Sequence, residues 1–337
     1  VMIKLLKKSL FLLCSLALLL PSVASADMEV VRIAGQDRYV TSSLVATNFF
    51  NSQYLIIASG EKYPDAIMGG CLSTQIKSPI LLVQKNNIPD SIKMELRRFT
   101  PKKIFVLGGQ SSISDSNIRK IKSICNAPIL RVAGKDRYQT AHKIDRLRID
   151  LQNLTAEQWD GITRHYIGAV SGENFYDALY AAPYIGLRKF ETGWIMSLIF
   201  CHSVEDFMKE SEDSVESLGF LIGDIKVLNS EGFYYPTIIK GRNRYETSAM
   251  IASNYYNKYI LNLPCDTVVI VSGENFPDGL SAAGFTALHN APILLTPKKH
   301  LDPAVRSFLK NNPVRKVIIV GGENSVSKSV ENELGHL

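Results

Sequence analysis

The sequence predicts an α/β protein built from three similar units, each with a parallel sheet. Three observations lead to this prediction: short motifs occur three times, apolar runs alternate with helical patterns, and motifs and runs keep the same order in each copy. Strands that are apolar on both faces are typical of parallel sheets covered by helices on both sides. The 337 residues and 46% hydrophobic content exclude a disordered or collagen-like chain.

The first 26 residues have the pattern of an export signal. Lys4, Lys7 and Lys8 precede an apolar run from Leu10 to Leu20, and Ala24-Ser25-Ala26 follows. A basic start, a short apolar centre and an A-x-A exit are typical of a cleaved secretory signal peptide. A membrane anchor is the alternative, but eleven apolar residues are too few for a hydrocarbon core about 30 Å thick. We therefore expect residues 1–26 to be removed.

Net charge and cysteine positions exclude two classes of function. Without the three lysines of the signal, the formal net charge falls from +6 to +3. So small a basic excess argues against a dedicated nucleic-acid binder. The remaining cysteines lie far apart without a C-x-x-C pair, so they predict buried core residues rather than a zinc site. They are Cys71, Cys125, Cys201 and Cys265.

Four motifs carry the repetition. In both the first and the third copy, the serine of the second motif lies 20 residues before a P-I-L-L segment and 49 residues before a Gly-Gly pair. R-[IV]-x-G-x-[DN]-R-Y occupies 32–39, 131–138 and, with isoleucine first, 238–245; S-G-E-x-[FY]-x-D-[AG] occupies 59–66, 171–178 and 272–279; P-I-L-L occupies 79–82 and 292–295; Gly-Gly occupies 108–109 and 321–322.

Each copy has the same predicted order of elements. In the first copy the apolar runs predict strands at 30–34, 54–58, 80–83 and 104–107, with helices at 41–50, 65–76, 91–99 and 114–124 between and after them. Ser114 or Asp115 is the expected cap of the last helix. The predicted boundaries are 27–126, 127–236 and 237–337.

The second copy departs from the other two. Aligning it with three inserted residues puts Trp194–Ser197 in the P-I-L-L place and Gly223-Asp224 in the Gly-Gly place. Thr155 and Gln158 have capping-box spacing and predict an additional short helix.

The S-G-E loop is the first candidate site, because it follows a strand and leads into a helix, where open α/β sheets bind ligands. Its glycines, at 60, 172 and 273, are expected to permit a tight turn. We interpret the aspartates as helix N-caps in preference to ligand residues. For the glutamates, a turn-holding role and a binding role both stay open. The residues concerned are Asp65, Asp177, Asp278, Glu61, Glu173 and Glu274.

Arg38, Arg137 and Arg244 are the second candidate site. A guanidinium group presents a fixed fork of donors that suits phosphate or carboxylate groups. The alternative is an internal ion pair with the carboxylates of the same repeat. The earlier arginine of the motif occurs in only two copies, as Arg32 and Arg131, and is the weaker candidate. The tyrosines that follow, at 39, 138 and 245, are expected to pack.

Motifs of the common enzyme classes are missing from the sequence. It contains no G-x-G-x-x-G, P-loop, G-x-S-x-G, H-E-x-x-H or D-x-D pattern. We therefore predict a protein that is not an enzyme, with no catalytic residues, no metal site and no cofactor.

The ordered set of four motifs resembles the type 2 cell wall-binding repeats of clostridial and related cell-wall proteins, from residue 30 to about 334. The resemblance implies three Toprim-like (flavodoxin-like) subdomains around a pseudo-threefold axis. It also implies non-covalent retention at the wall through an anionic, teichoic-acid-like polymer. The residues it implicates in polymer binding are Arg38, Arg137, Arg244, Pro79, Ile80, Leu81, Leu82, Pro292, Ile293, Leu294 and Leu295.

Location and partners follow from this resemblance and from the export signal. We expect a secreted protein of the cell wall or cell surface, with an anionic wall polysaccharide as its partner and other surface-layer proteins as further partners. Nucleic acid and, after signal cleavage, membrane are not expected. Two alternatives stay open: a peptidoglycan hydrolase of the amidase-associated kind, and a surface adhesin or array component that binds proteins. The repeats leave no stretch of this sequence for a separate catalytic domain.

Overall fold

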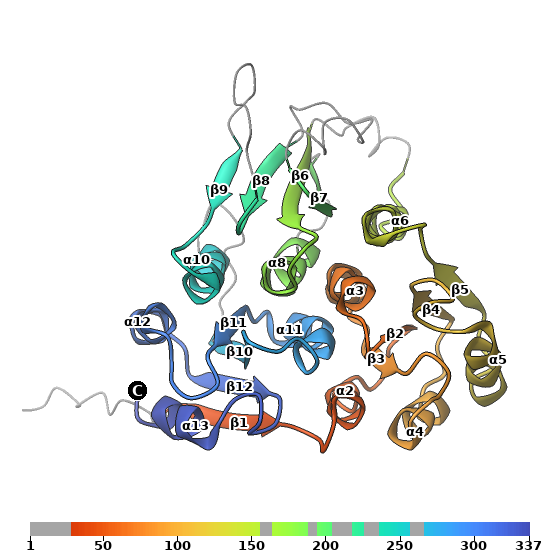
Figure 1. The fold of residues 1–337 in the computed structure, drawn as a ribbon, viewed down its shortest axis with the longest axis horizontal. Helices are drawn as coiled ribbons and strands as arrows, with labels where there is room; N and C mark the ends of the chain where they lie inside the picture. Colours follow the sequence, from red (N-terminus) through yellow and green to blue (C-terminus); the bar gives the residue numbers. More distant parts are fainter. Residues whose placement is uncertain (1–27, 156–163, 188–193, 204–217, 226–235, 257–265) are drawn as a thin grey trace, which may run out of the picture.

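Three four-stranded sheets surround a central group of helices in the computed structural model (Figure 1). The structure describes residues 28–155, 164–187, 194–203, 218–225, 236–256 and 266–337. Every strand pairing among these residues is parallel, and helices cover the sheets. The predicted fold class, three parallel-sheet units with pseudo-threefold symmetry, is confirmed.

The first sheet has the strand order β3-β2-β4-β5. Its strands are β2 (Tyr54–Ser59), β3 (Ile80–Val83), β4 (Lys103–Leu107) and β5 (Ile129–Val132). The helices beside it are α2 (Arg38–Ala46), α3 (Tyr63–Ile76), α4 (Asp90–Arg98) and α5 (Asp115–Ile124).

The second sheet has the order β7-β6-β8-β9. Its strands are β6 (Arg164–Ser171), β7 (Trp194–Cys201), β8 (Leu218–Ile222) and β9 (Thr237–Ile239), and its helices include α6 (Arg137–Asp150) and α8 (Tyr176–Gly186).

The third sheet has the order β1-β12-β10-β11. Its strands are β1 (Glu29–Ile33), β10 (Thr267–Ser272), β11 (Ile293–Thr296) and β12 (Lys316–Val320). Its helices are α10 (Arg244–Tyr256), the 3-10 turn η3 (Gly279–Ser281), α11 (Ala282–His289), α12 (Pro303–Asn311) and α13 (Lys328–Gly335).

The sheets cut across the sequence repeats, because the first strand of each copy joins the sheet of another copy. β5, at the start of the second copy, pairs with β4 of the first, and β9, at the start of the third, pairs with β8 of the second. β1 pairs with β12 near the C-terminus, so the N-terminal strand completes the last sheet (Figure 1). The three copies therefore form a closed ring.

The second copy corrects one sequence alignment. In the first and third sheets the motif serine pairs with the residue after P-I-L-L, as Ser59 with Val83 and Ser272 with Thr296. In the second sheet Ser171 pairs with Cys201. The P-I-L-L place therefore belongs to residues 197–200, and the prediction of Trp194–Ser197 is wrong by three residues. The added residues lengthen β6 and β7 at their starts, so the motif serine lies farther along the chain from the P-I-L-L place than in the other copies.

Capping explains why α2, α6 and α10 begin at the arginine of the first motif. Asp37 accepts hydrogen bonds from the main-chain N–H groups of residues 39 and 40, and Asp136 from that of residue 139. The predicted start of the first helix at Thr41 is therefore three residues late. A threonine recurs within each first turn and accepts from the motif glycine at 2.9–3.0 Å: Thr41 from Gly35, Thr140 from Gly134 and Thr247 from Gly241.

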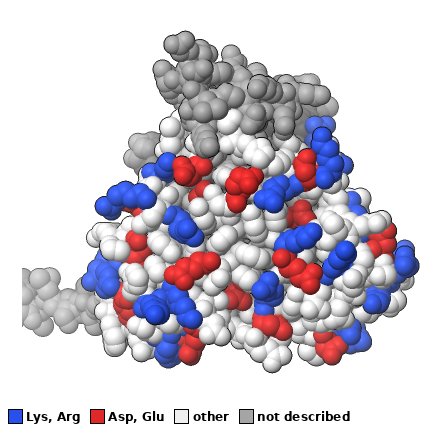
Figure 2. Space-filling view, viewed as in Figure 1, with Lys and Arg blue, Asp and Glu red and all other residues white. Residues whose placement is uncertain are grey.

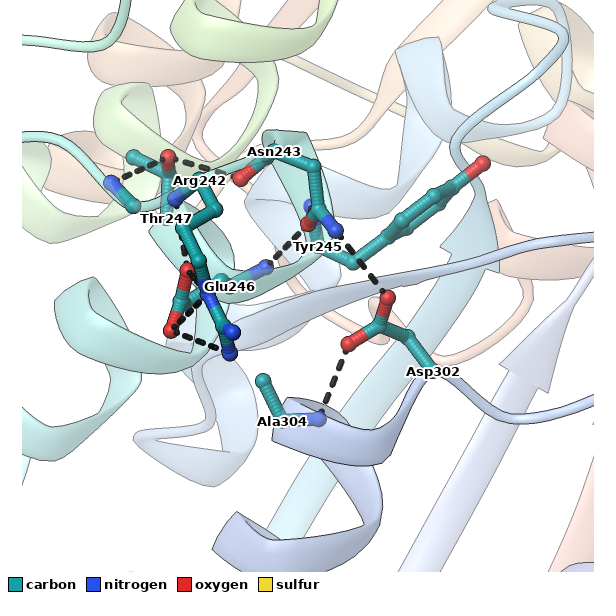
Figure 3. A network of polar contacts seen from close by, with 8 residues as sticks. Arg242, Asn243, Tyr245, Glu246, Thr247, Asp302 and Ala304 are labelled. Atoms are coloured by element: carbon teal, nitrogen blue, oxygen red, sulfur yellow. Dashed lines mark hydrogen bonds and ion pairs between the residues drawn. The ribbon is translucent and has the colours of Figure 1, made fainter.

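In the third copy an asparagine holds this capping position (Figure 3). Asn243 Oδ1 accepts from the main-chain N–H groups of Tyr245 and Glu246 at 3.0 and 2.9 Å. Its Nδ2 donates to Asp302, which caps α12 by accepting from Ala304 N at 2.8 Å. An amide can donate to that carboxylate, whereas a second aspartate would repel it.

The helices α3, α8 and α11 pack together at the centre (Figure 1). Small residues line their contacts: a side chain at Gly70 would meet Ala283, one at Gly186 would meet Thr74, and one at Gly284 would meet Ser73. Thr74 Oγ1 donates to Ala283 O at 3.0 Å across this contact. Close approach of these helices joins the three copies through one buried core.

The P-I-L-L strands lie at sheet edges, and helices cover those edges. Ser42 of α2 accepts from Leu82 N at 3.2 Å, and Ser248 of α10 accepts from Leu295 N at 3.1 Å. In the second copy Asp145 of α6 accepts from Leu198 N at 3.3 Å. These edge donors are therefore satisfied within the chain.

The structure tests the cysteine prediction for three residues, and some other predictions fall outside the described residues. Cys71, Cys125 and Cys201 are buried, which confirms the core prediction for them, and burial raises the pKa of Cys71 to about 12. Cys265, the export signal at 1–26 and the helix predicted from Thr155 and Gln158 lie outside the described residues. Within the described ranges, no helix has both the length and the apolar character needed to cross a bilayer.

Candidate functional site between the copies

The three motif arginines make the same contact in every copy. Arg38 Nη1 donates to the main-chain oxygen of Gly60, Arg137 Nη1 to that of Gly172 at 2.6 Å, and Arg244 Nη1 to that of Gly273 at 2.6 Å. None of the ion pairs between described residues includes these three guanidinium groups. The alternative of an internal ion pair is therefore wrong within the part of the chain that the structure describes.

Each arginine also reaches an aromatic ring of a different copy. The Arg38 guanidinium carbon lies 5.7 Å from the centre of the Phe276 ring, and that of Arg137 lies 5.7 Å from the Tyr63 ring. Arg244 is closer, at 4.0 Å from the Tyr176 ring. The contacts run from first to third, second to first and third to second copy, so each arginine lies where two copies meet.

The rings of the S-G-E loops meet one another. Ring centres of Tyr63, Phe175 and Phe276, one from each copy, lie 5.5–6.2 Å apart in all three pairs. Tyr63 Oη also accepts from Arg137 Nη1 and donates to Glu173 O, both at 3.2 Å. This aromatic triad, defined by these three residues, joins the loops of the copies. Arg38 and Arg137 lie beside it, whereas Arg244 lies over Tyr176, the residue after Phe175.

The glycines of the S-G-E loops are explained by packing. A side chain at Gly60, Gly172 or Gly273 would collide with the ring of Tyr39, Tyr138 or Tyr245. These glycines are not among the residues with positive φ. The tight-turn explanation is therefore wrong, and the predicted packing role of the tyrosines is confirmed.

The glutamates of the S-G-E loops hold neighbouring segments. Glu61 accepts from Lys85 N and Glu274 from Lys298 N, both at 3.1 Å, in the loops after the P-I-L-L strands. Glu173 instead accepts from Tyr138 Oη at 2.6 Å, and that hydrogen bond lowers the Glu173 pKa. All three carboxylates remain exposed, so a turn-holding role leaves them accessible to a ligand.

The aspartates do not cap helices, which corrects the sequence prediction. Lys62 holds the N-cap position of α3 and Phe175 that of α8. Asp278 does hold the N-cap position of η3, but its side chain makes no capping hydrogen bond. Instead, Asp65 accepts from Ser112 at 3.0 Å and Asp278 from Ser325 at 2.7 Å.

Asp177 in the second copy accepts from Asp224 N at 3.4 Å and from Tyr180 Oη. Burial raises the pKa of both Asp65 and Asp177. The aspartates therefore tie the S-G-E loop to the glycine loop of the same sheet.

The P-I-L-L side chains are core residues. Ile80, Leu81 and Leu82 are 0% exposed, and Ile293, Leu294 and Leu295 are at most 1% exposed. Pro79 and Pro292 precede the two strands and are also buried. These side chains present no surface to a polymer. They can affect binding only by supporting the helices that pack on them.

Arg32 and Arg131 fasten the exchanged strands. Arg32 donates to Gly321 O at 2.7 Å and forms an ion pair with Glu331 at 2.8 Å. Arg131 donates to Gly108 O at 2.6 Å and pairs with Asp115 at 2.9 Å. Both therefore support the ring closure described above.

A pocket of about 190 Å³ opens where the second and third copies meet. Arg244 and Arg242 lie in its wall, and Lys240 and Asp224 face each other there at 2.7 Å. Elsewhere, acidic and basic side chains are interspersed on the face seen in Figure 2. Among the described residues no group of His, Cys, Asp and Glu is arranged to hold a metal ion. The lining residues are Tyr176, Asp177, Gly223, Asp224, Lys240, Gly241, Arg242, Asn243, Arg244 and Thr247.

Two features of the site were missed from the sequence. The aromatic triad occupies the [FY] position of the S-G-E motif, so its recurrence was visible, but nothing in one sequence shows that the three rings meet. The threonine two residues after each motif tyrosine was an equally regular signal for the helix starts.

Comparison with protein families gives a match on both sides of the second copy. The family described as cell wall binding domain 2 matches residues 32–118 and 238–331. The departures of the second copy at P-I-L-L and Gly-Gly agree with the gap between these ranges.

Two curated relatives from Bacillus subtilis are similar over most of this chain. N-acetylmuramoyl-L-alanine amidase LytC is 25% identical over 324 residues, which are 96% of this chain and 61% of that protein. The protein called amidase enhancer is 25% identical over 304 residues, or 90% of this chain and 40% of its own. The chain thus spans less than two thirds of either relative.

Two solved structures from Clostridium difficile share the fold. Cwp6 aligns with a TM-score of 0.71 at 22% identity, covering 92% of this chain and 48% of that one. Cwp8 aligns with a TM-score of 0.69 at 18% identity, covering 92% and 51%. At these identities the likeness shows the fold alone.

Proposed function

The chain belongs to the cell wall binding domain 2 family, and we propose that it retains its protein at the bacterial cell wall by binding an anionic, teichoic-acid-like polymer. The observation that carries this proposal is the family match together with a basic group that recurs at all three junctions between copies. Repeated sites and a repeating polymer allow avidity beyond that of one contact.

The arginines are the residues proposed to meet the polymer. Each guanidinium donates through Nη1 to a glycine oxygen and forms no ion pair with a carboxylate among the described residues. Besides the Tyr138 hydrogen bond, the charge of Arg137 does help to lower the Glu173 pKa. Arginine forks suit phosphate and carboxylate groups. The exposed Glu61, Glu173 and Glu274 border the same loops and would discriminate against poorly placed anions. The P-I-L-L strands are proposed to support α2 and α10 by packing against them.

We place this activity outside the cell, with signal cleavage at about residue 26 preceding binding. Other surface-layer proteins remain proposed further partners. The amidase relatives raise a catalytic alternative, but both extend well beyond the part that this chain matches. We therefore propose a binding role without catalysis for these residues.

Retention on isolated walls tests the proposal. The mature chain is mixed with Gram-positive walls before and after mild acid extraction of their anionic polymer, and the bound fraction is measured by sedimentation. We expect binding to intact walls and its loss on extracted walls. Equal binding to both would contradict a polymer partner and favour a protein or peptidoglycan partner.

A charge-matched pair of variants localises the contact. Combined Arg38→Gln, Arg137→Gln and Arg244→Gln should abolish retention, since glutamine keeps a donor but loses the charge. Arg97→Gln, Lys122→Gln and Lys310→Gln remove the same charge from exposed positions elsewhere and should leave retention nearly unchanged. Equal loss in both triple variants would mean that only bulk charge matters. Clearing of peptidoglycan by the purified wild type would overturn the proposal of no catalysis.

A further inference from the structure

The two glycines of each Gly-Gly loop have different physical explanations. The first is required by the backbone, because Gly108 and Gly321 have φ of 98° and 130° and a side chain on either would collide with Asp65 or Asp278. The second is not. Gly109 and Gly322 are not among the positive-φ residues, and a Cβ on either would meet no atom within 4 Å. The folded chain alone gives no reason for a glycine at these two positions.

Both unexplained glycines lie at junctions between copies. Gly108 N donates to Val132 O and Gly321 N to Ile33 O, each at 2.9 Å, so each glycine loop ends beside the strand that leads to a motif arginine. The second copy makes the same contact from Gly223 N to Ile239 O at 3.0 Å. There the loop residue and Arg244 line one pocket. By this equivalence Gly109 lies in the junction of Arg137, and Gly322 in that of Arg38.

At the third junction, two charged side chains line the pocket where the other copies have a glycine and an alanine. Asp224 stands at the position of Gly109 and Gly322, and its carboxylate lies 2.7 Å from Lys240 Nζ. Alanines, Ala34 and Ala133, occupy the place of Lys240 in the other two copies. The acid and the lysine therefore occur together, at the junction where the motif arginine also lies closest to a ring.

We infer that the chain has two polymer sites and a third junction that the Asp224–Lys240 ion pair closes to the polymer. The open sites are the junctions of Gly109 with Arg137 and of Gly322 with Arg38, where an anionic group of the polymer lies against main chain that no side chain shields. A glycine allows such close approach. At the third junction the Asp224 carboxylate lies in the pocket wall, where it repels the anion and holds Lys240 in an ion pair. This inference rests on the proposed function and specifies its sites.

Substitutions at the open positions test the inference without disturbing the fold. The probe is the anionic polymer released by mild acid from walls that retain the wild type, and its affinity for the full mature chain is measured by biolayer interferometry. Combined Gly109→Asp and Gly322→Asp should weaken binding by at least about tenfold, because both arms of a bivalent contact are lost. Urea unfolding of this variant should match the wild type, since the new side chains enter open space.

The chain offers a matched control and a gain-of-function variant. A Cβ at Gly335 would also enter open space, but this glycine lies at the end of α13, so Gly335→Asp should leave binding unchanged. Combined Asp224→Gly and Lys240→Ala should open the third junction and raise the number of short polymer fragments bound per chain from two toward three.

Each outcome decides one question. Unchanged affinity of the Gly109→Asp, Gly322→Asp variant, with wild-type binding intact, would overturn the two-site inference and leave the proposed function standing. A stoichiometry of three in the wild type would also overturn it. Failure of the wild type to bind the polymer would contradict the proposed function itself.

Discussion

At the scale of single residues, most motif positions hold the S-G-E loop of their own copy in place. The arginine donates to a loop oxygen, the tyrosine covers a glycine, and the aspartate of the S-G-E loop reaches the glycine loop. The sequence identified these positions because they recur. It misassigned the aspartates because a cap and a longer-range acceptor leave the same residue in the same place, and only the tertiary contact distinguishes them.

The adjacent glycines of the first Gly-Gly loop should respond differently to substitution. Gly108→Ala should lower the free energy of unfolding by about 1–3 kcal/mol, because it forces a left-handed backbone and crowds Asp65. Gly109→Ala should change it by less than about 0.5 kcal/mol, since its Cβ meets nothing. Urea unfolding of both variants measures this, and equal losses would show that the loop differs from the one described.

Burial of Asp65 predicts that the free energy of unfolding depends on pH. Its pKa is raised in the folded chain, so the folded state holds a proton that the unfolded state releases from about pH 4 upward. Stability contributed by this group should therefore fall as pH rises between the unfolded and the folded pKa, and then level off. Asp65→Asn keeps the acceptor for Ser112 and should remove this fall. A constant difference in unfolding free energy between wild type and variant across that range would contradict the assignment.

At the scale of elements, the pattern of apolar runs predicted the strands of the first copy to within one or two residues. The helix starts were less accurate because they depend on caps, and α2 begins at Arg38 because Asp37 accepts from its first turn. The predicted register of the second copy was wrong because β7 has apolar residues on both sides of Ser197, so either side can be aligned with P-I-L-L. Strand exchange was not predicted, since repetition alone does not say which copy receives a strand.

Removal of β1 tests the ring closure. A chain lacking residues 28–34 loses the Arg32–Glu331 and Glu29–Lys316 ion pairs and the acceptor of Gly321 N. Hydrogen exchange at Gly321 should accelerate strongly. The equivalent Gly108 N–H keeps its acceptor, Val132 O, and serves as the internal control. Equal protection of Gly321 in both chains would show that β1 does not close the third sheet.

At the scale of the whole molecule, three small sheets form one ring around three central helices, and the same polar contacts recur at each junction. The fold class and the family could be predicted because four ordered motifs recur. The difference between the third junction and the other two could not be predicted, because Asp224 and Lys240 become neighbours only in the folded chain. The repeat boundaries at 126 and 236 remain predictions of the sequence.

The formal charge of the chain after the signal is only +3, so attraction to a polyanion depends on where the arginines lie. The most direct test is the affinity of the mature chain for purified anionic wall polymer across a salt series. We predict that affinity falls steadily as salt rises, because charged contacts at the exposed junctions are screened. Affinity that is indifferent to salt, or binding only to wall freed of the polymer, would contradict the account.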